Sequence, residues 1–548
     1  MLDHRGDLRE VAGSDPTVLA ALTEPAMYDG LLPAAVHETD ASWVFVVGEL
    51  AYRIKKPLFR GSVNLGTLAR RRAACRAELR VNQALAPGIY LGLKAIVATS
   101  DGFRFAPPDA ADAVEYAVQM RRVDEADTLA GLIAGGALTR AHIRDVARRL
   151  ADFHERANAI PGGAANHVLD LWRANIRELE QLKHPKRWQL DVLADFGEAF
   201  VRAHAREIER RGRDGHIRDG HGDLRCEHVV VSGGVRVIDR IEFDPALRRI
   251  DVAADLANLA MDLEARAAHR AARQLVSDYR RAGGSPGSEA LRAFYAAHRA
   301  LMTAKSELTA AAALQPHARS ERIERAEQMW TLADQLCWRA RRPLVIVVCG
   351  PAASGKSTLA AELAERSQLS VVSSDQVRQE HAGLSPDERP GPEHYTGRFS
   401  RATYDLLSHA ALAELHDNGG VIVDATCAAR AQRGRLMHRL DLRAVTRLVI
   451  DCRVTLDTAL ARAAQRIASR QRSSEPAVVA EQFRSFEPLD ELPSGSVLAL
   501  DAEQPIDQQL AALTRAVDRR LSLGHGYSRR VRPPWRLLHS QGPWSPGQ

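Results

Sequence analysis

A lysine and a serine follow a glycine-bounded turn in the second half of the chain, an arrangement that can bind a nucleoside triphosphate. Within PLVIVVCGPAASGKSTL, residues 343–359, four residues separate Gly350 from the Gly355-Lys356-Ser357 triplet. Glycines let successive backbone N–H groups approach a phosphate, the lysine reaches the β- and γ-phosphates, and the serine hydroxyl ligates magnesium. The pattern therefore predicts a P-loop that binds ATP and Mg2+, formed by Gly350, Pro351, Ala352, Ala353, Ser354, Gly355, Lys356, Ser357 and Thr358.

The segments around this turn are those that a P-loop needs. An apolar, β-branched run ends at Gly350, and Leu359 and Leu363 stand one helical turn apart after it, which predicts a strand before the loop and a helix after it. Apolar runs and helical patterns then alternate up to residue 523. Such alternation is typical of a parallel sheet with helices on both faces, so we predict an α/β domain over residues 342–523.

Charged residues at the strand ends of this region could activate and bind an acceptor. Asp375 ends a predicted strand, Arg378 follows one helical turn later, and Asp424 closes the strand VIVDAT. This region resembles the P-loop kinases of small hydroxyl compounds, including polynucleotide kinase, zeta toxin and gluconate kinase. The resemblance implies that Asp375 activates the acceptor hydroxyl, that Arg378 binds the acceptor and that Asp424 holds the magnesium shell. It also implies catalytic lid arginines at Arg462 and Arg466, which their i, i+4 spacing places on one helix face. The structural alternatives are an Asp that only caps a helix and arginines that only face solvent.

Carboxylates also cluster in the first half of the chain, around a histidine-glycine-aspartate motif. His221-Gly222-Asp223 is followed by Asp239, after the apolar run VRVI, and by Asp255, in an Asp-Leu-Ala triplet. Phosphoryl transfer needs few protein groups, chiefly one carboxylate beside the acceptor and others on a metal that neutralises the phosphate. The spacing therefore indicates a second site for the same chemistry.

The segments around these carboxylates predict a fold in two parts. SWVFVVGELAYRIKKPL predicts a hairpin ending at Pro57, residues 67–85 a helix, and LKAIVAT and VEYAVQM two more strands. Helices follow, among them residues 139–157, and the carboxylates lie in and beside a loop with two short strands around Ser232-Gly233-Gly234.

This order of elements resembles the bilobal kinase-like fold of aminoglycoside phosphotransferases. The motifs that carry the resemblance are residues 221–223, Asp239 and the triplet at Asp255. The resemblance implies that Asp223 accepts the proton of the substrate hydroxyl, that Asp239 holds magnesium and that Asp255 supports the catalytic loop. It further implies that a lysine of the strand YRIKK pairs with nucleotide phosphates and with Glu78 of the next helix.

Several features of the first site leave alternatives open. Strand alternation places Lys55 and Lys56 on opposite faces, so that one of them can reach the phosphates, and we favour Lys55. His228 stands five residues after Asp223, where the family has a metal-binding asparagine; it is predicted either to face the metal or to pack under the loop. No G-x-G-x-x-G loop precedes the lysine strand. These departures keep open a kinase-like domain that does not catalyse transfer.

The composition is that of a globular protein with more than one domain. The chain has 548 residues, of which 45% are apolar and 26% charged, and no apolar run approaches the ~20 residues of a membrane span. Six cysteines without a C-x-x-C pair indicate buried, reduced thiols, and a cytoplasmic location is expected. The net charge of +6 accompanies only seven lysines among 75 basic residues, which indicates a bias towards arginine rather than a nucleic-acid surface.

Together these patterns predict a bifunctional fusion. An N-terminal helix and loop cover residues 1–35, an α+β kinase-like domain resembling aminoglycoside phosphotransferases covers 36–341, a P-loop kinase-like domain covers 342–523, and a disordered tail covers 524–548. The predicted function is ATP- and Mg2+-dependent phosphoryl transfer to the hydroxyl of a small molecule, with two separate ATP sites. The alternatives are an ATP-binding sensor with a degenerate kinase-like domain and a nucleic-acid end kinase. No membrane partner is expected.

Overall fold

The chain divides into two compact units, each of which is described by itself. Residues Met1–Gly163 and Arg211–Gly287 form the first unit, and Ala164–Arg210 and Ser288–Gln548 form the second. The domain boundary at residue 342 was placed where the sequence changes from the kinase-like motifs to the P-loop pattern, and it stays a prediction. The computed structural model describes residues 16–39, 41–60, 63–162, 165–182, 187–312, 314–385, 387–388, 390–440, 442, 445–469, 475–493 and 495–524.

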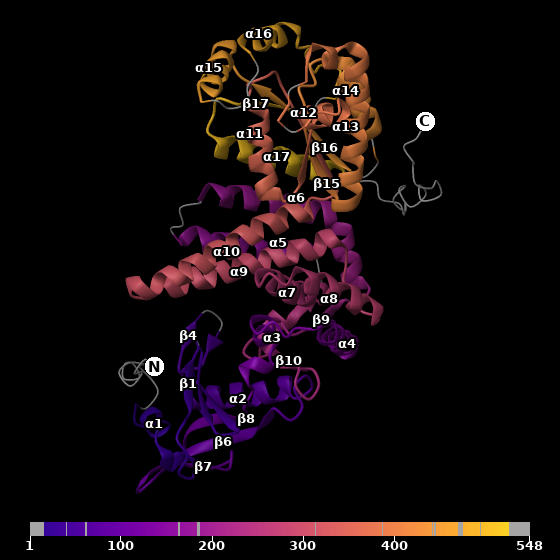
Figure 1. The fold of residues 1–548 in the computed structure, drawn as a ribbon. Coiled ribbons are helices and arrows are strands. Elements are labelled where there is room, and N and C mark those ends of the chain that lie inside the picture. Colours follow the sequence, from indigo (N-terminus) through magenta and orange to yellow (C-terminus); the bar gives the residue numbers. More distant parts are fainter. Residues whose placement is uncertain are drawn as a thin grey trace. The chain divides into compact units, whose positions relative to one another are not determined.

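An antiparallel sheet of six strands, in the order β1-β2-β3-β8-β6-β7, begins the first unit (Figure 1). The sequence predicted β2, β3, β6 and β8, whereas the short edge strands β1 and β7 were not predicted. The bounds are β1 Ala35–Glu38, β2 Ser42–Val47, β3 Leu50–Lys55, β6 Tyr90–Thr99, β7 Gly102–Ala106 and β8 Ala113–Arg121, with a separate small pair, β4 Phe59–Arg60 and β5 Val63–Asn64.

Alternation along β3 sends its side chains to two different layers. Tyr52 and Ile54 join the apolar cluster that includes α1 (Pro16–Ala21) and the 3-10 turn η1 (Pro25–Tyr28). Arg53 and Lys55 lie on the opposite face, where they meet Glu78 of α2 (Leu68–Asn82). Because the side-chain period of a strand is two residues, both cations face the same helix. The helix predicted to reach residue 85 ends at residue 82.

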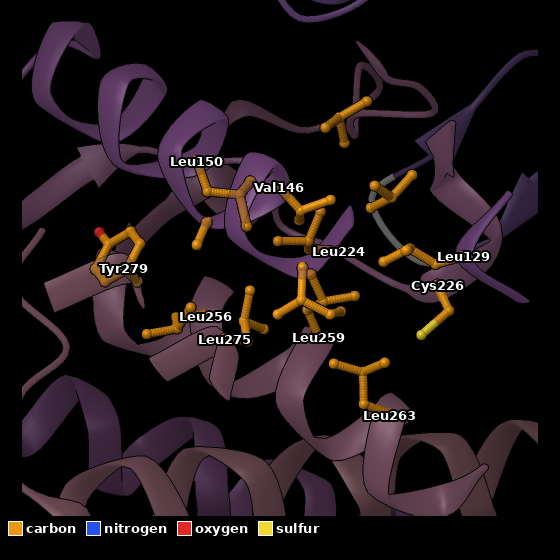
Figure 2. Packing of buried hydrophobic residues seen from close by; sticks show 14 of the residues in the cluster. Leu129, Val146, Leu150, Leu224, Cys226, Leu256, Leu259, Leu263, Leu275 and Tyr279 are labelled. Carbon is orange, nitrogen blue, oxygen red and sulfur yellow. The ribbon is translucent and has the colours of Figure 1, made fainter. Parts of the chain in front are cut away.

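The helical part of the first unit holds the His221-Gly222-Asp223 loop over an apolar core. Leu224 and Cys226, which directly follow the motif, are fully buried in this core together with residues of α4, α7 and α8 (Figure 2). The core therefore positions the loop. The bounds are η2 Glu125–Asp127, α3 Leu129–Ala134, α4 Arg140–Arg156, β9 Ile217–Asp219, η3 Cys226–His228, β10 Val229–Val230, β11 Arg236–Val237, η4 Pro245–Arg248, β12 Arg249–Asp251, α7 Val252–Ala265 and α8 His269–Arg281.

The second unit contains a parallel sheet of five strands in the order β14-β15-β13-β16-β17, as the sequence predicted (Figure 1). The connecting segments are helical, and several short helices were not predicted. The bounds are β13 Leu344–Cys349, α11 Lys356–Ser367, β14 Ser370–Ser373, α12 Ser374–His381, η5 Pro392–Tyr395, α13 Gly397–Asn418, β15 Gly420–Asp424, α14 Arg430–Leu440, β16 Thr446–Arg453, α15 Leu456–Ala468, α16 Pro476–Ser485, β17 Val497–Asp501 and α17 Ile506–Gly524.

Both faces of this sheet are covered, which is why its central strand is apolar throughout. Leu344, Ile346 and Val348 of β13 pack with α11 and α17, whereas Val345 and Val347 pack with α13 and α14. A parallel strand buried on both faces is expected to be an unbroken apolar run. The site residues of this unit therefore lie where the strands end rather than along them.

Four long helices complete the second unit. Arg341, directly after α10, is buried and its Nε lies 2.7 Å from the Asp518 carboxylate of α17, and the ring of Trp172 stacks on Phe294 with centroids 4.8 Å apart. These contacts join the helices to each other and to the sheet layer. The bounds are α5 Ala165–Gln181, α6 Arg187–Arg213, whose residues from Arg211 belong to the first unit, α9 Glu289–Ala312 and α10 Pro316–Ala340.

Among the residues described, no helix combines the length and the apolar character needed to cross a membrane. All six cysteines are buried and free. The disorder predicted for the tail after residue 524 lies outside the described residues.

Candidate functional site

The predicted P-loop has the backbone conformation that its glycines allow. Gly350 has φ +146°, and a Cβ atom there would lie 2.9 Å from the carbonyl oxygen of Cys452 and 2.8 Å from Ser354 Oγ. Gly355 has φ +98° and Ala353 has φ +63°. Because positive φ and such close approach favour glycine, the sequence pattern and the loop geometry agree at Gly350 and Gly355.

Lys356 and Ser357 begin helix α11 beside the carboxylate of Asp424. The ammonium of Lys356 donates to the carbonyl oxygen of Pro351 at 3.0 Å, and the Ser357 hydroxyl donates to Asp424. Burial raises the pKa of Asp424, and the positive charge of Lys356 opposes that rise. The site thus joins one cation, one hydroxyl and one buried carboxyl group.

Asp375 lies next to this group because two parallel strands end together. Ser373, the last residue of β14, pairs in register with Asp424, the last residue of β15. Asp375 follows in the first turn of α12, is exposed, and its negative charge further raises the pKa of Asp424. The structure therefore brings Asp375, Asp424 and Lys356 to one edge of the sheet, although they are far apart in sequence.

Arg378 lies one turn after Asp375 and faces a loop side chain. It is buried, its NH1 donates to the carbonyl oxygen of His394 at 2.6 Å, and its guanidinium lies 4.6 Å from the centroid of the Tyr395 ring. Its Nε has no hydrogen-bond partner among the described residues. Burial and then Asp375 raise the pKa of Tyr395, while Arg378 lowers it, so these three side chains share one environment.

The two predicted lid arginines lie on α15. Arg462 NH2 donates to the carbonyl oxygen of Ala502 at 2.9 Å, and its NH1 lies 3.5 Å from that of Ser354. The structure thus brings Arg462 to the P-loop. Arg466 follows one turn later on the same helix, and its catalytic role stays a prediction.

The donors at the P-loop fit magnesium. Magnesium prefers oxygen ligands and is held through one or two protein groups together with substrate phosphates. The Ser357 hydroxyl and the Asp424 carboxylate are such groups, and they already touch each other. An ion between them and the nucleotide would neutralise phosphate charge.

In the first unit, Lys55 is held between two carboxylates. Its ammonium lies 2.7 Å from Glu78 Oε2 and 2.5 Å from Glu242 Oε1. Lys56 instead pairs with Glu38 and lies over the ring of Trp43. The structure therefore brings Lys55, and not Lys56, to Glu78.

Arg53 binds the carboxylate that was predicted to hold the metal. Its NH1 forms an ion pair with Asp239 and lies 2.9 Å from Glu78 Oε1. Burial raises the pKa of Asp239, but Arg53, His228 and Lys55 together outweigh burial and hold that pKa below its usual range. Asp239 is thus ionised and already paired with a cation.

The catalytic-loop motif is fixed by the Asp255 carboxylate, as the resemblance implied. The backbone N–H groups of His221 and Gly222 donate to Asp255, the latter at 3.0 Å, and His154 Nε2 lies 3.3 Å from it. Burial lowers the pKa of His221 to about 4. The motif is therefore held by a neutral imidazole and an ionised carboxylate.

His228 is joined to Asp223 by a hydrogen bond. Nδ1 of His228 donates to the backbone oxygen of Asp223 at 2.8 Å, and its Nε2 lies 3.7 Å from Asp239. The Asp223 carboxylate lies 3.4 Å from the guanidinium of Arg225. His228 thus fixes the loop, and a metal role for it stays a prediction.

Magnesium does not fit the first site as it is arranged. The Asp239 carboxylate is paired with Arg53, and His228 would offer a nitrogen where magnesium prefers oxygen. The two sites therefore differ in what their carboxylates contact: Asp239 is paired with a guanidinium, whereas Asp424 meets a serine hydroxyl.

Residues 345–489 match the family model described as "AAA domain". Over 405 residues, the chain is 30% identical to "Uncharacterized protein Rv2004c" of Mycobacterium tuberculosis, covering 71% of this chain and 78% of that protein. The chain belongs to the family of this mycobacterial protein. Mycobacterium bovis has a member with the same identity and coverage, "Uncharacterized protein Mb2027c".

The present chain is also similar to several solved structures. They include a putative kinase from Chloroflexus aurantiacus (25% identity, TM-score 0.28, 33% of this chain and 98% of that one). A second is a choline/ethanolamine kinase family protein from Mesorhizobium loti (14% identity, TM-score 0.33, 59% of this chain and 98% of that one). A third is a gluconokinase from Sinorhizobium meliloti (17% identity, TM-score 0.25, 33% of this chain and 94% of that one). The predicted fold class, an α+β domain followed by a P-loop domain with a parallel sheet, is confirmed.

The sequence analysis missed four side chains of the two sites. Arg53 had a signal, because it stands two residues before Lys55 and must share its strand face. Glu242 stands three residues after Asp239 with no motif of its own. The others, Gln482 and Tyr395, lie on short elements that were not predicted. Gln482 accepts from the P-loop N–H of Ala352 at 2.7 Å.

Proposed function

We propose that the protein transfers the γ-phosphoryl group of ATP to a hydroxyl group of a small molecule, in the second unit. The observation that carries the proposal is the meeting of a P-loop lysine with two carboxylates, Asp375 and Asp424, at one edge of a parallel sheet. Ligands of open parallel sheets bind at the carboxyl ends of the strands. The exposed carboxylate is then free to meet the acceptor.

Each group has a definite task in this proposal. Asp375 accepts the proton of the acceptor hydroxyl while the oxygen of that hydroxyl forms a bond to the γ-phosphorus. The bond between that phosphorus and the β–γ bridging oxygen breaks, which leaves ADP and a phosphate ester. Lys356 and Arg462 stabilise charge on the transferring group. Magnesium held by Ser357 and Asp424 would neutralise the phosphates.

Arg378 indicates which acceptors to examine first. Its contacts are the His394 carbonyl oxygen, the Ser400 hydroxyl at 3.4 Å and the Tyr395 ring, none of which is a carboxylate. A buried cation is costly unless it meets an anion. Acceptors that carry a carboxylate or phosphate beside the hydroxyl are therefore placed first in the panel.

The proposal is tested by acceptor-stimulated ADP release from full-length protein. The panel contains hydroxy acids, sugars, polyols, amino alcohols, aminoglycosides and oligonucleotides with free 5′-hydroxyl ends. Stimulation by one small-molecule class, with the phosphate ester found by mass spectrometry, supports the proposal. Stimulation by oligonucleotides alone, lost steeply with added salt, would make the protein a nucleic-acid end kinase.

One observation favours a second function, a nucleotide-binding regulatory role for the first unit. Its predicted metal carboxylate, Asp239, is already paired with Arg53. A site in this state can bind nucleotide while its transfer chemistry is weak. ATP binding without turnover on any acceptor would favour this sensor function over the enzyme.

A further inference from the structure

We infer that the Arg53 guanidinium takes the place of a divalent cation in the first unit, so that this unit binds the phosphates of a metal-free nucleotide. The inference rests on the proposed nucleotide site of the first unit and goes beyond it. It follows from how Arg53, Lys55 and three carboxylates are arranged around one buried point.

Arg53 and Lys55 are presented together to the site. They stand two residues apart on β3 and therefore project from the same face of the sheet. Glu78 bridges them, with Oε1 2.9 Å from Arg53 NH1 and Oε2 2.7 Å from the Lys55 ammonium. One carboxylate thus holds two cations side by side, and each cation meets a second carboxylate, Arg53 that of Asp239 and Lys55 that of Glu242.

Asp239 lies opposite, and the backbone around it is fixed in that position. Its φ is +64°, an uncommon conformation for a residue other than glycine. Its N–H donates to the Tyr90 hydroxyl at 3.1 Å, and the next N–H, of Arg240, donates to Asn82 Oδ1 at 2.9 Å. The pairing of Asp239 with Arg53 is therefore built into the loop rather than being a contact of two mobile surface side chains.

The two cations and the carboxylate that bridges them are buried, whereas Asp239 is partly exposed. Of the side chains, 14% of Arg53, 3% of Lys55, none of Glu78 and 36% of Asp239 is exposed. Burial alone would lower the pKa of Arg53, but Asp239 and Glu78 raise it well above the ordinary value, so the guanidinium stays charged. A divalent ion at Asp239 would have to displace the Arg53 guanidinium that already pairs with this carboxylate.

A guanidinium can supply what the metal would have supplied to phosphate. It has five N–H donors in a planar fork that suits phosphate oxygens, and it cannot lose its proton in a protein. Arg53 already uses NH1 on Glu78 and Asp239. A phosphate that enters beside Lys55 would exchange with Asp239 and Glu242 for the two cations, which are already in place without a metal.

The P-loop site provides the internal contrast. Asp424 has a serine hydroxyl and a lysine as neighbours, whereas Asp239 forms an ion pair with an arginine. The inference therefore predicts opposite metal requirements for the two nucleotide sites of one chain.

The test uses full-length protein carrying Lys356→Ala, so that nucleotide binding reports on the first unit. Binding of a fluorescent ATP analogue is titrated with excess Mg2+ and with excess EDTA, in this parent, with Arg53→Ala added, and with Arg104→Ala added as a control. Arg104 is an exposed arginine of β7, at the far edge of the same sheet. The parent and the Arg104 variant should bind in EDTA within about threefold of their affinity in Mg2+, and Arg53→Ala should lower the affinity in EDTA about tenfold or more.

Three results would overturn the inference. They are binding by the parent only with Mg2+, binding in EDTA that Arg53→Ala leaves unchanged, and no binding in either buffer. The last result would also remove the nucleotide site of the first unit, whereas ATP turnover by protein with Lys356 intact tests the second unit separately. If Arg53→Ala does not fold, Arg53→Met with Asp239→Asn removes both charges at once, and this protein must also lose binding in EDTA.

Discussion

The two sites use similar residue types, but they differ in what the key carboxylate contacts. In the first unit a buried guanidinium pairs with Asp239 and keeps it ionised. In the second unit burial raises the pKa of Asp424, and its neighbours are the Ser357 hydroxyl and the Lys356 charge. One carboxylate is thus already neutralised by the protein, whereas the other can gain from a bound cation.

This difference shows that a motif does not by itself establish metal-dependent chemistry. Both regions contain a lysine, a strand-end aspartate and a second carboxylate at spacings typical of phosphoryl transfer. What separates them is that an arginine of β3 pairs with the strand-end aspartate of the first unit. Because a paired ion and a metal compete for the same oxygen atoms, the partner of the carboxylate decides the outcome.

The largest expected effect comes from removing the P-loop lysine. Lys356→Ala should abolish Mg2+-dependent ATP turnover, because this side chain supplies the mobile positive charge at the transferring phosphates. ADP release by full-length protein measures it. Lys305→Ala serves as the control, because it removes a lysine of α9 that pairs with Glu178 of α5. Turnover unchanged by Lys356→Ala would place the chemistry in the first unit and reverse the comparison.

A smaller but specific loss is expected from Asp375→Asn. The amide cannot accept the hydroxyl proton, so transfer should fall roughly 10²–10⁴-fold while ATP affinity stays nearly constant. Asp457→Asn is a matched control, since Asp457 is an exposed carboxylate in the first turn of another helix. Loss of ATP affinity with normal transfer would make Asp375 a metal ligand or a structural residue.

The comparison also predicts a pH dependence that magnesium can shift. The pKa of Asp424 is raised by burial, so its carboxylate is lost at a higher pH than an ordinary aspartate as the solution is acidified. Magnesium binds the ionised form, and therefore more Mg2+ should move the acid limb of the activity profile to lower pH. The measurement is ADP release against pH at two Mg2+ concentrations. An acid limb that does not move with Mg2+ would assign it to another group.

The smallest effect concerns the stability of the first unit. Burial lowers the pKa of His221 from an ordinary 6.5 to about 4, so the unfolded chain binds a proton over this range before the folded chain does. Stability should therefore fall as pH decreases from about 6.5 towards 4, by roughly 2 kcal/mol at pH 5 relative to pH 7. His221→Gln removes this dependence, so its stability deficit relative to the parent should be smaller at pH 5.

Urea unfolding at the two pH values measures this change, with His269→Gln as the control because His269 is an exposed residue of α8. An equal deficit for His221→Gln at both pH values would mean that His221 titrates alike in the folded and unfolded chains.

The sequence by itself determined the second unit well. The residues of a P-loop are contiguous, and their glycines act through local backbone conformation, as φ +98° at Gly355 illustrates. The parallel sheet followed from the alternation of apolar runs with helical patterns. In the first unit strand patterns indicated β2, β3, β6 and β8, but β1 and β7, the short strands at the two edges of the sheet, were missed.

Only the tertiary structure decided which charges meet. Arg53 and Asp239 are 186 residues apart, and Lys55 and Glu242 are 187 apart. No local pattern can encode such pairs, because they form only when a strand of the sheet and the loop after the helical core are brought together. Burial then sets their energies, since the cost of desolvating a charge depends on every element packed around it. For this reason the sequence could name the carboxylates of both sites, whereas only the fold showed that one of them already has its cation.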